Sequence, residues 1–450
     1  MSAAPSAARV AAIRVVKVLQ RAGHQALFAG GCVRDQLLGR DAKDFDVATS
    51  AHPDEVLSLF PRATAVGRSF GVILVHSEEH STEVATFRAE ADYEDGRRPG
   101  SVHFTDAQTD AGRRDFTINA LFLDPVTDQL FDFVEGQSDL HHRLIRTVGD
   151  PHARFAEDHL RMLRAVRFAA ALDFSVHPDT ADAIQAHASS IRRISAERIQ
   201  QELTRLLTES SRPGSGLRLL HETGLLVHLL PEVAAMVGQA QPAEFHPEGD
   251  VFTHTCMMLD AMQHPTPTLA YAVLLHDVGK PPTAAATREP DGSTRIRFNG
   301  HARVGADMAR EILQRLRMPK RHIEAISHCV ENHMRFMEVQ KMRPATLRRL
   351  TGNLTFPVEL ELHRLDCLCS HGDISNHEFL VDYLAHREDE PRLPPNWVTG
   401  HDIMALGVPE GPEVGEWMAR AYEAQLDGHH ADRAALLAWL RGEVAGRRSE

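Results

Sequence analysis

The segment Gly30-Gly31-Cys32-Val33-Arg34-Asp35 and the following Asp44-Phe45-Asp46-Val47 decide the fold of the N-terminal part of this 450-residue chain. The glycine pair follows an apolar run, residues 26–29, which predicts a strand that ends in a tight turn able to approach a phosphate without Cβ hindrance. Asp44 and Asp46 lie two residues apart in a second predicted strand, so both carboxylates face the same side of a sheet. Two such carboxylates beside a phosphate-binding loop suit a pair of Mg²⁺ ions in phosphoryl or nucleotidyl transfer.

Length and composition restrict the class of protein. The chain is long enough for two to four domains, and it has no apolar run that could cross a membrane. The N-terminus lacks the features of a signal peptide, and the five cysteines show no CxxC spacing, so we expect no disulfide framework or zinc ribbon and a cytoplasmic location. A net charge of −13 argues against nonspecific coating of nucleic acid. Local basic clusters at 192–198, 320–321 and 341–349 leave RNA binding open, although each alone reads as a solvated helix face.

Periodicity predicts an α/β region followed by helices. A helix is expected over 6–22, ending before Gly23, and strands and helices then alternate to about residue 148, with a strand at 44–49. Beyond Pro151 the pattern is mainly helical. The fold class is therefore a small mixed sheet with helices, followed by mainly α-helical parts. We expect four parts, with bounds at 1–148, 149–211, 212–390 and 391–450.

Two further segments complete a candidate catalytic site in the first part. Glu83 begins a β-branched and aromatic segment that could pair beside the strand of Asp44 and Asp46, although an exposed strand-edge glutamate is the simpler interpretation of that residue alone. The segment Arg113-Arg114-Asp115 places two guanidiniums beside a carboxylate. Guanidiniums suit triphosphate oxygens, and an aspartate suits a ribose hydroxyl.

Five motifs in this order resemble the class II tRNA nucleotidyltransferase and bacterial poly(A) polymerase superfamily. They are residues 30–40, Asp44 with Asp46 and Glu83, residues 113–120 (RRDFTINA), residues 157–164 (EDHLRMLR) and residues 195–199 (SAERI). The resemblance implies a nucleotidyltransferase head over 1–148 and a nucleobase-recognising neck over 149–211. It implies that Mg²⁺ binds Asp44 and Asp46, and that Glu83 helps to activate the RNA 3′-hydroxyl. The implied nucleotide contacts are Gly30, Gly31, Arg34, Arg113 and Arg114 to phosphate and Asp115 to ribose.

Asp158 and Arg161 predict how the base is chosen. They lie three residues apart, on one face of a helix predicted over 155–171. Cytosine and adenine both present an amino donor beside a ring acceptor, whereas uracil and guanine present the reverse order. An Asp/Arg pair therefore accepts C and A and leaves polar groups unpaired against U and G. An ordinary helix ion pair is the alternative, and the surrounding motifs favour base reading.

A second constellation predicts a metal site in the third part. Its members are imidazoles and carboxylates that suit one or two divalent ions, Mg²⁺ or a transition metal, in phosphoester hydrolysis: His254, His276, Asp277, His301, His333 and Asp366. The order resembles the HD-domain metal phosphohydrolases. Four other histidines are rival ligands that we expect at the surface or in the core: His322, His328, His363 and His371.

Taken together, the resemblance implies addition or repair of the 3′-CCA end of tRNA from CTP and ATP, with cyclic-phosphodiesterase or phosphatase activity in the HD domain. The alternatives are a poly(A) polymerase, an enzyme of A-only or CC-only addition, an HD phosphohydrolase with an RNA-binding head, and a non-enzymatic RNA-binding module. The HD domain could also serve RNA binding alone. Residues 88–103 are a candidate for the loop that switches the pocket from C to A, and residues 391–450 for a contact with the tRNA body. The oligomeric state, monomer or homodimer, stays open.

Overall fold

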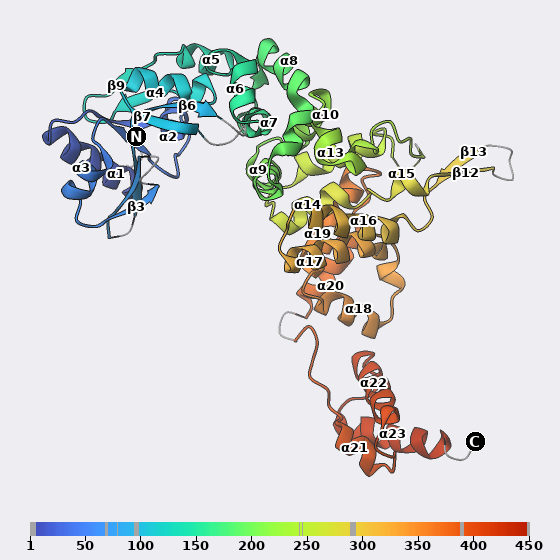
Figure 1. The fold of residues 1–450 in the computed structure, drawn as a ribbon. Helices are drawn as coiled ribbons and strands as arrows, with labels where there is room; N and C mark the ends of the chain where they lie inside the picture. The colour runs from blue at the N-terminus through green and yellow to red at the C-terminus, as the bar shows by residue number, and fades with distance from the viewer. Residues whose placement is uncertain are drawn as a thin grey trace. The chain divides into compact units, whose positions relative to one another are not determined.

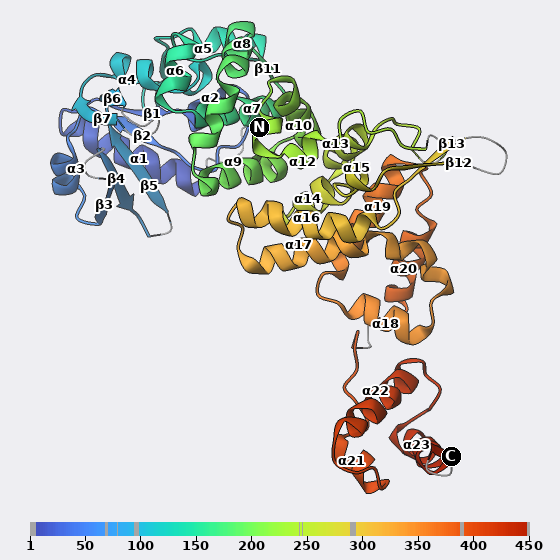
Figure 2. The same cartoon turned by 45° about the vertical axis from the view of Figure 1, so that its right-hand side comes forward.

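The computed structural model describes residues 6–67, 71–78, 80–93, 99–242, 244, 246–288, 294–387 and 391–447. The chain forms two compact units, one of Met1–Ala235 with Gln314–Met318 and the other of Met236–Leu313 with Pro319–Glu450. Figures 1 and 2 show most strands in the N-terminal part of the chain, and a later part that is helical apart from the hairpin of β12 and β13. This agrees with the predicted fold class. In the described part of the chain, no helix is both long and apolar enough to span a bilayer.

The first unit begins with a mixed α/β fold. Its elements to residue 145 are α1 (Ala7–Arg21), β1 (Ala26–Ala29), α2 (Gly31–Leu37), β2 (Val47–Thr49), α3 (Pro53–Leu59), β3 (Ala63–Gly67), β4 (Val72–His76), β5 (Ser81–Thr86), β6 (Arg88–Tyr93), β7 (Pro99–Phe104), α4 (Ala107–Arg113), η2 (Thr117–Asn119), β8 (Phe122–Asp124), β9 (Gln129–Phe131), α5 (Gly136–His142) and β10 (Leu144–Ile145). Helices then dominate: α6 (Pro151–Glu157), α7 (Leu160–Leu172), β11 (Ser175–Val176), α8 (Pro178–His187), η3 (Ala188–Arg193), α9 (Ala196–Glu209), α10 (Pro213–Glu222), α11 (Leu226–Leu229) and α12 (Pro231–Ala234).

A seven-stranded sheet, in the order β3-β4-β5-β2-β1-β8-β9, organises the head. Strand β2 pairs with β1 in antiparallel fashion and with β5 in parallel, with Val84 opposite Val47. The strand predicted over 44–49 begins only at Val47, because pairing with both neighbours starts there; Asp44 and Asp46 precede it. The sheet therefore brings the end of β1, the approach to β2 and the middle of β5 together.

Apolar burial holds this arrangement in place. Helix α1 is amphipathic and buries its apolar face, which includes Val16 and Leu19. A core cluster containing Leu27, Phe87 and Phe122 lies against the sheet. Full burial of one such side chain contributes about 1.5–3 kcal/mol. The glycine turn follows directly: Gly30 has a φ of +73°, which favours glycine, and α2 begins at the next residue.

The helix predicted over 155–171 is wrong in one respect, because the chain forms two helices with a break at Asp158. Asp158 has extended backbone angles, φ −143° and ψ 104°, and its side chain accepts a hydrogen bond from the Leu160 N–H at 3.0 Å. An aspartate that bonds a nearby backbone N–H competes with helix continuation. Because of this break, Asp158 and Arg161 do not share one face of a single helix, as their spacing predicted.

In its described residues, the second unit is helical apart from one hairpin. Its elements are α13 (Val251–Ala261), α14 (Pro267–Leu275), α15 (Lys280–Thr283), β12 (Ala285–Arg288), β13 (Thr294–Arg297), α16 (His301–Arg315), α17 (Lys320–Asn332), η4 (His333–Lys341), α18 (Pro344–Gly352), α19 (Phe356–Cys369), α20 (Ser375–Ala385), α21 (Gly400–Ala405), α22 (Pro412–Leu426) and α23 (Arg433–Arg447). Helix α14 is buried from Leu269 to Leu275. The last three helices share a separate small core around Trp417.

Candidate functional site

The first unit contains a cleft of about 620 Å³ at the edge of the sheet. It is lined by ten of the residues that the sequence predicted: Gly30, Gly31, Arg34, Asp46, Glu83, Arg113, Arg114, Asp115, Asp158 and Arg161. Asp44 lies two residues before Asp46 in the chain and is not among the residues that line the cleft. The structure therefore brings together residues from four of the five motifs, and the fifth motif adds Arg198.

The carboxylates of the cleft are close enough to interact. Glu83 lies on β5 one residue before Val84, which pairs with Val47, so it stands beside Asp46 as the sequence predicted. Desolvation in the cleft raises the pKa of Asp46 to about 6, and the negative charges of Glu83 and Asp44 add to this effect. Like charges held together in this way suit a divalent cation, because oxygen ligands and negative charge are what Mg²⁺ requires. The donor set therefore fits the predicted Mg²⁺.

The glycine turn and the arginines fit one another closely. A Cβ atom on Gly30 would lie 3.1 Å from Arg114 Nη1, so the missing side chain makes room for that guanidinium. Arg34 donates from Nη1 to Asn119 Oδ1 at 2.7 Å and pairs with Asp35, also at 2.7 Å. The guanidiniums of Arg34 and Arg114 therefore lie beside the start of α2.

One buried carboxylate orients the predicted phosphate-binding arginines. Asp110 is 1% exposed, and its Oδ1 accepts from Arg113 Nε at 2.8 Å while its Oδ2 accepts from Arg114 Nη2 at 3.1 Å. The same Oδ1 accepts the backbone N–H of Arg88 at 3.1 Å. Sequence reasoning missed Asp110, although its spacing of three and four residues from the two arginines on α4 is the helical spacing of an ion pair.

Asp115 is held by a different arginine. Arg164 donates to Asp115 Oδ2 from Nη2 at 2.6 Å, and the Phe116 N–H and the Asn119 amide donate to Oδ1. Burial alone would raise the pKa of Asp115, but the Arg164 guanidinium outweighs this and lowers it. Both carboxylate oxygens are thus engaged by the protein. The predicted ribose contact of Asp115 stays a prediction.

Asp158 and Arg161 both line the cleft, yet they do not pair with each other. Asp158 Oδ2 accepts from Arg198 Nη2 at 2.8 Å. Arg161 Nη1 donates to Glu157 Oε2 at 2.5 Å, and Nη2 donates to the Arg113 carbonyl at 3.2 Å. The simple ion pair between Asp158 and Arg161, considered as the alternative to base reading, is therefore not formed.

Positive charge dominates the described lining of the cleft. Nine arginines line it, and the five that the sequence-based site omitted are Arg88, Arg164, Arg167, Arg198 and Arg205. Arg167 lies over the Phe168 ring at 4.0 Å and donates to Glu202 Oε2 at 2.6 Å. The spacing of the four arginines on α7 and α9 would have indicated a basic face, but not that this face lines the cleft. Such a lining suits a polyanionic ligand.

The segment proposed as a C-to-A switching loop is partly described. Strands β6 and β7 pair in antiparallel fashion, with Arg88 opposite Phe104. Residues 94–98 lie outside the described residues. The switching role stays a prediction.

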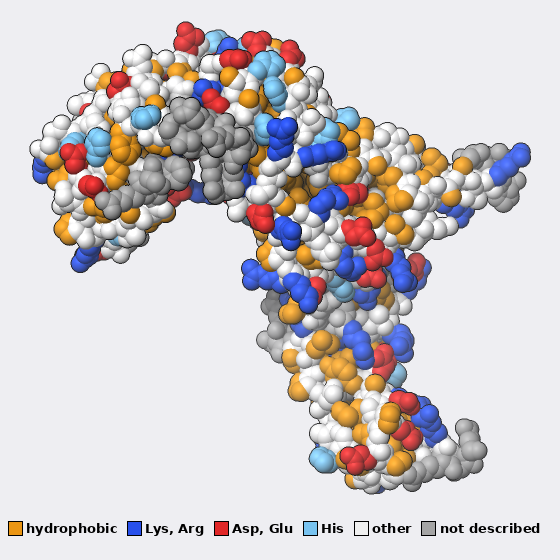
Figure 3. All heavy atoms as spheres, viewed as in Figure 1, with side chains coloured by type: hydrophobic (Ala, Val, Ile, Leu, Met, Phe, Trp, Pro, Cys, Tyr) orange, Lys and Arg blue, Asp and Glu red, His pale blue; other side chains and the backbone are white. Residues whose placement is uncertain are grey.

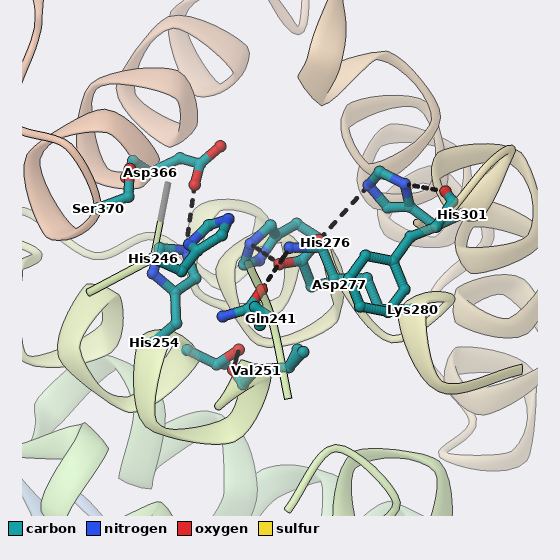
Figure 4. A network of polar contacts seen from close by, with 12 residues as sticks. Gln241, His246, Val251, His254, His276, Asp277, Lys280, His301, Asp366 and Ser370 are labelled. Carbon is teal, nitrogen blue, oxygen red and sulfur yellow. Dashed lines mark hydrogen bonds and ion pairs between the residues drawn. The ribbon is translucent and has the colours of Figure 1, made fainter. Parts of the chain in front are cut away.

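The second unit gathers the predicted HD residues in one place, and Figure 4 labels all of them except His333. His254 comes from α13, and His276 with Asp277 follows α14 directly. His301 and His333 begin α16 and η4, and Asp366 lies on α19. Among the rivals, His371 lines the adjoining pocket, whereas His363 is buried and stacks on Phe336 at 5.0 Å.

Three of these histidines are oriented by their own backbone. In each case Nδ1 contacts the carbonyl oxygen three residues earlier, at 2.8 Å for His276 and His301 and at 2.7 Å for His333. This leaves Nε2 facing the centre, which is the arrangement of a metal-ligating imidazole. Burial lowers the pKa of His333 to about 4, so this ring is neutral and able to ligate.

The ligand atoms of the predicted residues form two groups, each within 4.8 Å: His254, His276 and Asp366, and Asp277, His301 and His333. Among the described residues, His254 also belongs to a third such group, with His246 and Glu248. Asp277 Oδ2 lies 3.1 Å from His276 Nε2, and Asp277 Oδ1 lies 3.5 Å from His301 Nε2. Within the described residues, His276 Nε2 and Asp277 Oδ2 are buried without a hydrogen bond. Imidazole nitrogens and carboxylate oxygens grouped in this way fit one or two divalent ions.

His254 is oriented differently, by a carboxylate that the sequence did not single out. Its Nδ1 lies 2.6 Å from Glu248 Oε1, and its Nε2 lies 3.1 Å from Asp366 Oδ1. The same Glu248 oxygen contacts His246 Nδ1 at 2.9 Å. Burial opposes protonation, but Asp366 and Glu248 together raise the pKa of His254 to about 9.

A pocket of about 460 Å³ adjoins this centre. Its cations are Lys280, Arg295 and Arg297, and Lys280 Nζ pairs with Asp277 Oδ2 at 2.7 Å. The two arginines belong to β13, and Figure 3 shows basic side chains, coloured blue, on the hairpin of β12 and β13. Apolar side chains, among them Phe298 and Met337, complete the lining. The pocket therefore suits a phosphate that carries an apolar group.

Comparison with known proteins assigns these regions to families. Residues 26–146 match the poly A polymerase head domain, residues 173–237 match the probable RNA and SrmB-binding site of polymerase A, and residues 251–369 match the HD domain. The chain thus contains a poly A polymerase head domain, a region that matches the RNA-binding site of polymerase A, and an HD domain. Its HD domain is confirmed by the same comparison.

Curated relatives are CCA-adding enzymes. That of Geobacillus sp. (strain WCH70) is 46% identical over 219 residues, 48% of this chain and 54% of the relative. That of Geobacillus thermodenitrificans (strain NG80-2) is 47% identical over 219 residues, with the same two coverages. The chain thus spans about half the length of the curated relatives it matches.

Solved structures extend the likeness along the chain. The crystal structure of Bacillus stearothermophilus CCA-adding enzyme in complex with CTP has a TM-score of 0.74 and 26% identity, covering 99% of this chain and 99% of that chain. The Thermotoga maritima CCA-adding enzyme complexed with tRNA_CCA shares the fold, with a TM-score of 0.59 and 20% identity over 97% of this chain and 95% of that chain.

Proposed function

We propose that this chain adds or repairs the 3′-terminal CCA of tRNA, using CTP and ATP without a nucleic-acid template. The observation that carries the proposal is the cleft in which Asp46 and Glu83 face a wall of arginines. The relatives and structural neighbours named above support the same activity. The cytoplasmic location stays a prediction, and the oligomeric state, monomer or homodimer, stays open.

The residues of the cleft would divide the work. The turn at Gly30 and Gly31 and the guanidiniums of Arg34, Arg113 and Arg114 would hold the triphosphate, since planar guanidiniums bond phosphate oxygens in pairs. Glu83 would orient the RNA 3′-hydroxyl for in-line attack on the α-phosphorus. Mg²⁺ held by Asp46 and Asp44 would supply charge stabilisation at the reacting phosphate.

Base selection is assigned to Asp158 and Arg161. The pair offers one acceptor and one donor at the cleft, which matches the edge shared by cytosine and adenine. Asp158 would accept the exocyclic amino group, and Arg161 would donate to the ring acceptor.

A second activity is proposed for the HD domain: hydrolysis of a 2′,3′-cyclic phosphate or a terminal phosphate at an RNA end. Two groups of metal-ligand atoms beside a cationic pocket favour it. A divalent ion bound by these ligands would activate water. A cyclic phosphate blocks extension of an RNA 3′ end, so its removal beside a polymerase is chemically coherent.

The test uses tRNA transcripts that end at the discriminator base, at C or at CC, each incubated with one nucleoside triphosphate at a time. The proposal predicts C addition to the first two transcripts and A addition to the third. Addition of A alone, and only to the third transcript, would indicate an A-adding enzyme. Addition of A to every transcript would indicate a poly(A) polymerase.

A further inference from the structure

Arg198 occupies a position in the cleft that the assignment of base reading to Asp158 and Arg161 does not use. It comes from the first turn of α9, and its side chain is 23% exposed. Arg198 Nη2 donates to Asp158 Oδ2 at 2.8 Å, while the Leu160 N–H donates to Asp158 Oδ1 at 3.0 Å. Each carboxylate oxygen thus has one fixed donor, and these two contacts set the rotation of the group.

The second terminal nitrogen of Arg198 has a different environment. Among the described residues, Arg198 Nη1 is buried and has no hydrogen-bond partner. A buried donor without an acceptor is costly, so a ligand that supplies an acceptor there is favoured. The terminal nitrogens of Arg161, in contrast, already donate to Glu157 and to backbone carbonyls. Arg198 Nη1 is therefore an unpaired donor beside Asp158, in addition to any N–H group of Arg161 that reaches the base.

We propose that Arg198 is a specificity-determining residue of the nucleotide site, which fixes Asp158 as an acceptor for the exocyclic amino group of cytosine or adenine. This inference rests on the proposed nucleotidyl transfer. A carboxylate held in one rotation presents lone pairs to the base. In uracil or guanine a keto oxygen takes the place of the amino group, so two acceptors would face each other with no hydrogen between them. Without Arg198 the carboxylate can rotate, and this exclusion weakens.

The test compares the full-length R198Q and R198K variants with the wild type, measuring kcat and KM for CTP and UTP on a tRNA transcript that lacks CCA. R198Q should raise the ratio of UTP to CTP use on the order of 10-fold, because the loss of one hydrogen bond weakens discrimination by about that factor. R198K should lie between R198Q and the wild type, because lysine keeps the charge but not the planar fork. The matched control is R14Q on the exposed face of α1, away from the cleft. It should leave the ratio unchanged.

Two results would overturn the inference. One is an equal loss of CTP and UTP use in R198Q, which would show that Arg198 only supports the fold; the other is an unchanged ratio in both variants. Should R198Q not fold, R198K carries the test, and an unchanged UTP-to-CTP ratio in that variant alone overturns the inference. Failure of the wild type to add C to the transcript would instead contradict the proposed function itself, so the two failures are distinguishable.

Discussion

Glu83 lies beside Asp46 because β5 pairs in parallel with β2, with Val84 opposite Val47. A parallel register carries residues that precede the paired positions to the same edge of the sheet. Two carboxylates far apart in the sequence therefore reach one cleft, and the arginines of α4 and α7 face them from the remaining walls.

The raised pKa of Asp46 gives a pH-dependent prediction. The pKa in the folded, metal-free protein is about 6, above the ordinary value near 3.9. The ionised carboxylate therefore lowers stability as pH rises through 6, and Asp46→Asn should relieve this. The gain should stay below about 1 kcal/mol, because the Asp46 side chain keeps contact with solvent at the mouth of the cleft and solvent screens its charge. Urea unfolding with a chelator at pH 5 and pH 8 measures it. The variant should gain more at pH 8, and a variant less stable than the wild type there would contradict the account.

The ion pair of Asp115 with Arg164 predicts the opposite pH dependence. The lowered pKa of Asp115 means that its stabilisation is present above pH 4 and is lost as pH falls through the folded-state pKa. Asp115→Asn should cost about 2 kcal/mol at pH 7, less than for an isolated buried pair because Glu202 also lies 3.6 Å from Arg164. Unfolding curves at pH 7 and pH 3 should show the cost shrinking at low pH. Asp182→Asn, at an exposed position on α8, is the control and should cost little at either pH.

The two catalytic centres should respond separately to substitution. Asp46→Ala should abolish nucleotide addition and preserve phosphohydrolysis, because the HD ligands belong to the other unit. Asp277→Ala should do the reverse, since it removes the carboxylate that both His276 and His301 contact. Parallel assays of the two activities on each purified variant provide the measurement. Loss of both activities in either folded variant would show that the sites are not independent.

Glu248 should determine how tightly the HD centre retains metal. Glu248→Ala removes the carboxylate 2.6 Å from His254 Nδ1, and metal affinity should fall about 10- to 100-fold. Glu248→Gln should recover part of it, because its amide oxygen can still accept from Nδ1. Metal content after dialysis against a graded chelator series measures this without any activity. Glu311→Ala, at an exposed position on α16 of the same unit, is the control. Equal metal retention in Glu248→Ala and the control would contradict the prediction.

Sequence reasoning predicted the residues that carry recognisable local patterns. The glycine turn, the carboxylate pair and the HD order depend on spacing along the chain, and the structure brings their members together. Partners set by long-range packing were not predictable in this way. Arg164 reaches Asp115 from 49 residues away, and Arg198 reaches Asp158 from 40 residues away.

The break at Asp158 shows a second limit of sequence patterns. The apolar periodicity over 155–171 is compatible with one helix, and only the side-chain bond to the Leu160 N–H decides against it. Glu248 was overlooked for a related reason, since its role depends on contact with His254 rather than on ligand spacing.

The length of the product made from CTP and ATP together tests the central claim most directly. A tRNA transcript lacking CCA and an unrelated RNA of similar length are each incubated with both nucleotides, and products are resolved at single-nucleotide length. The account predicts three added nucleotides on the tRNA, ending in A, and little extension of the unrelated RNA. A long A tail on the unrelated RNA would contradict it.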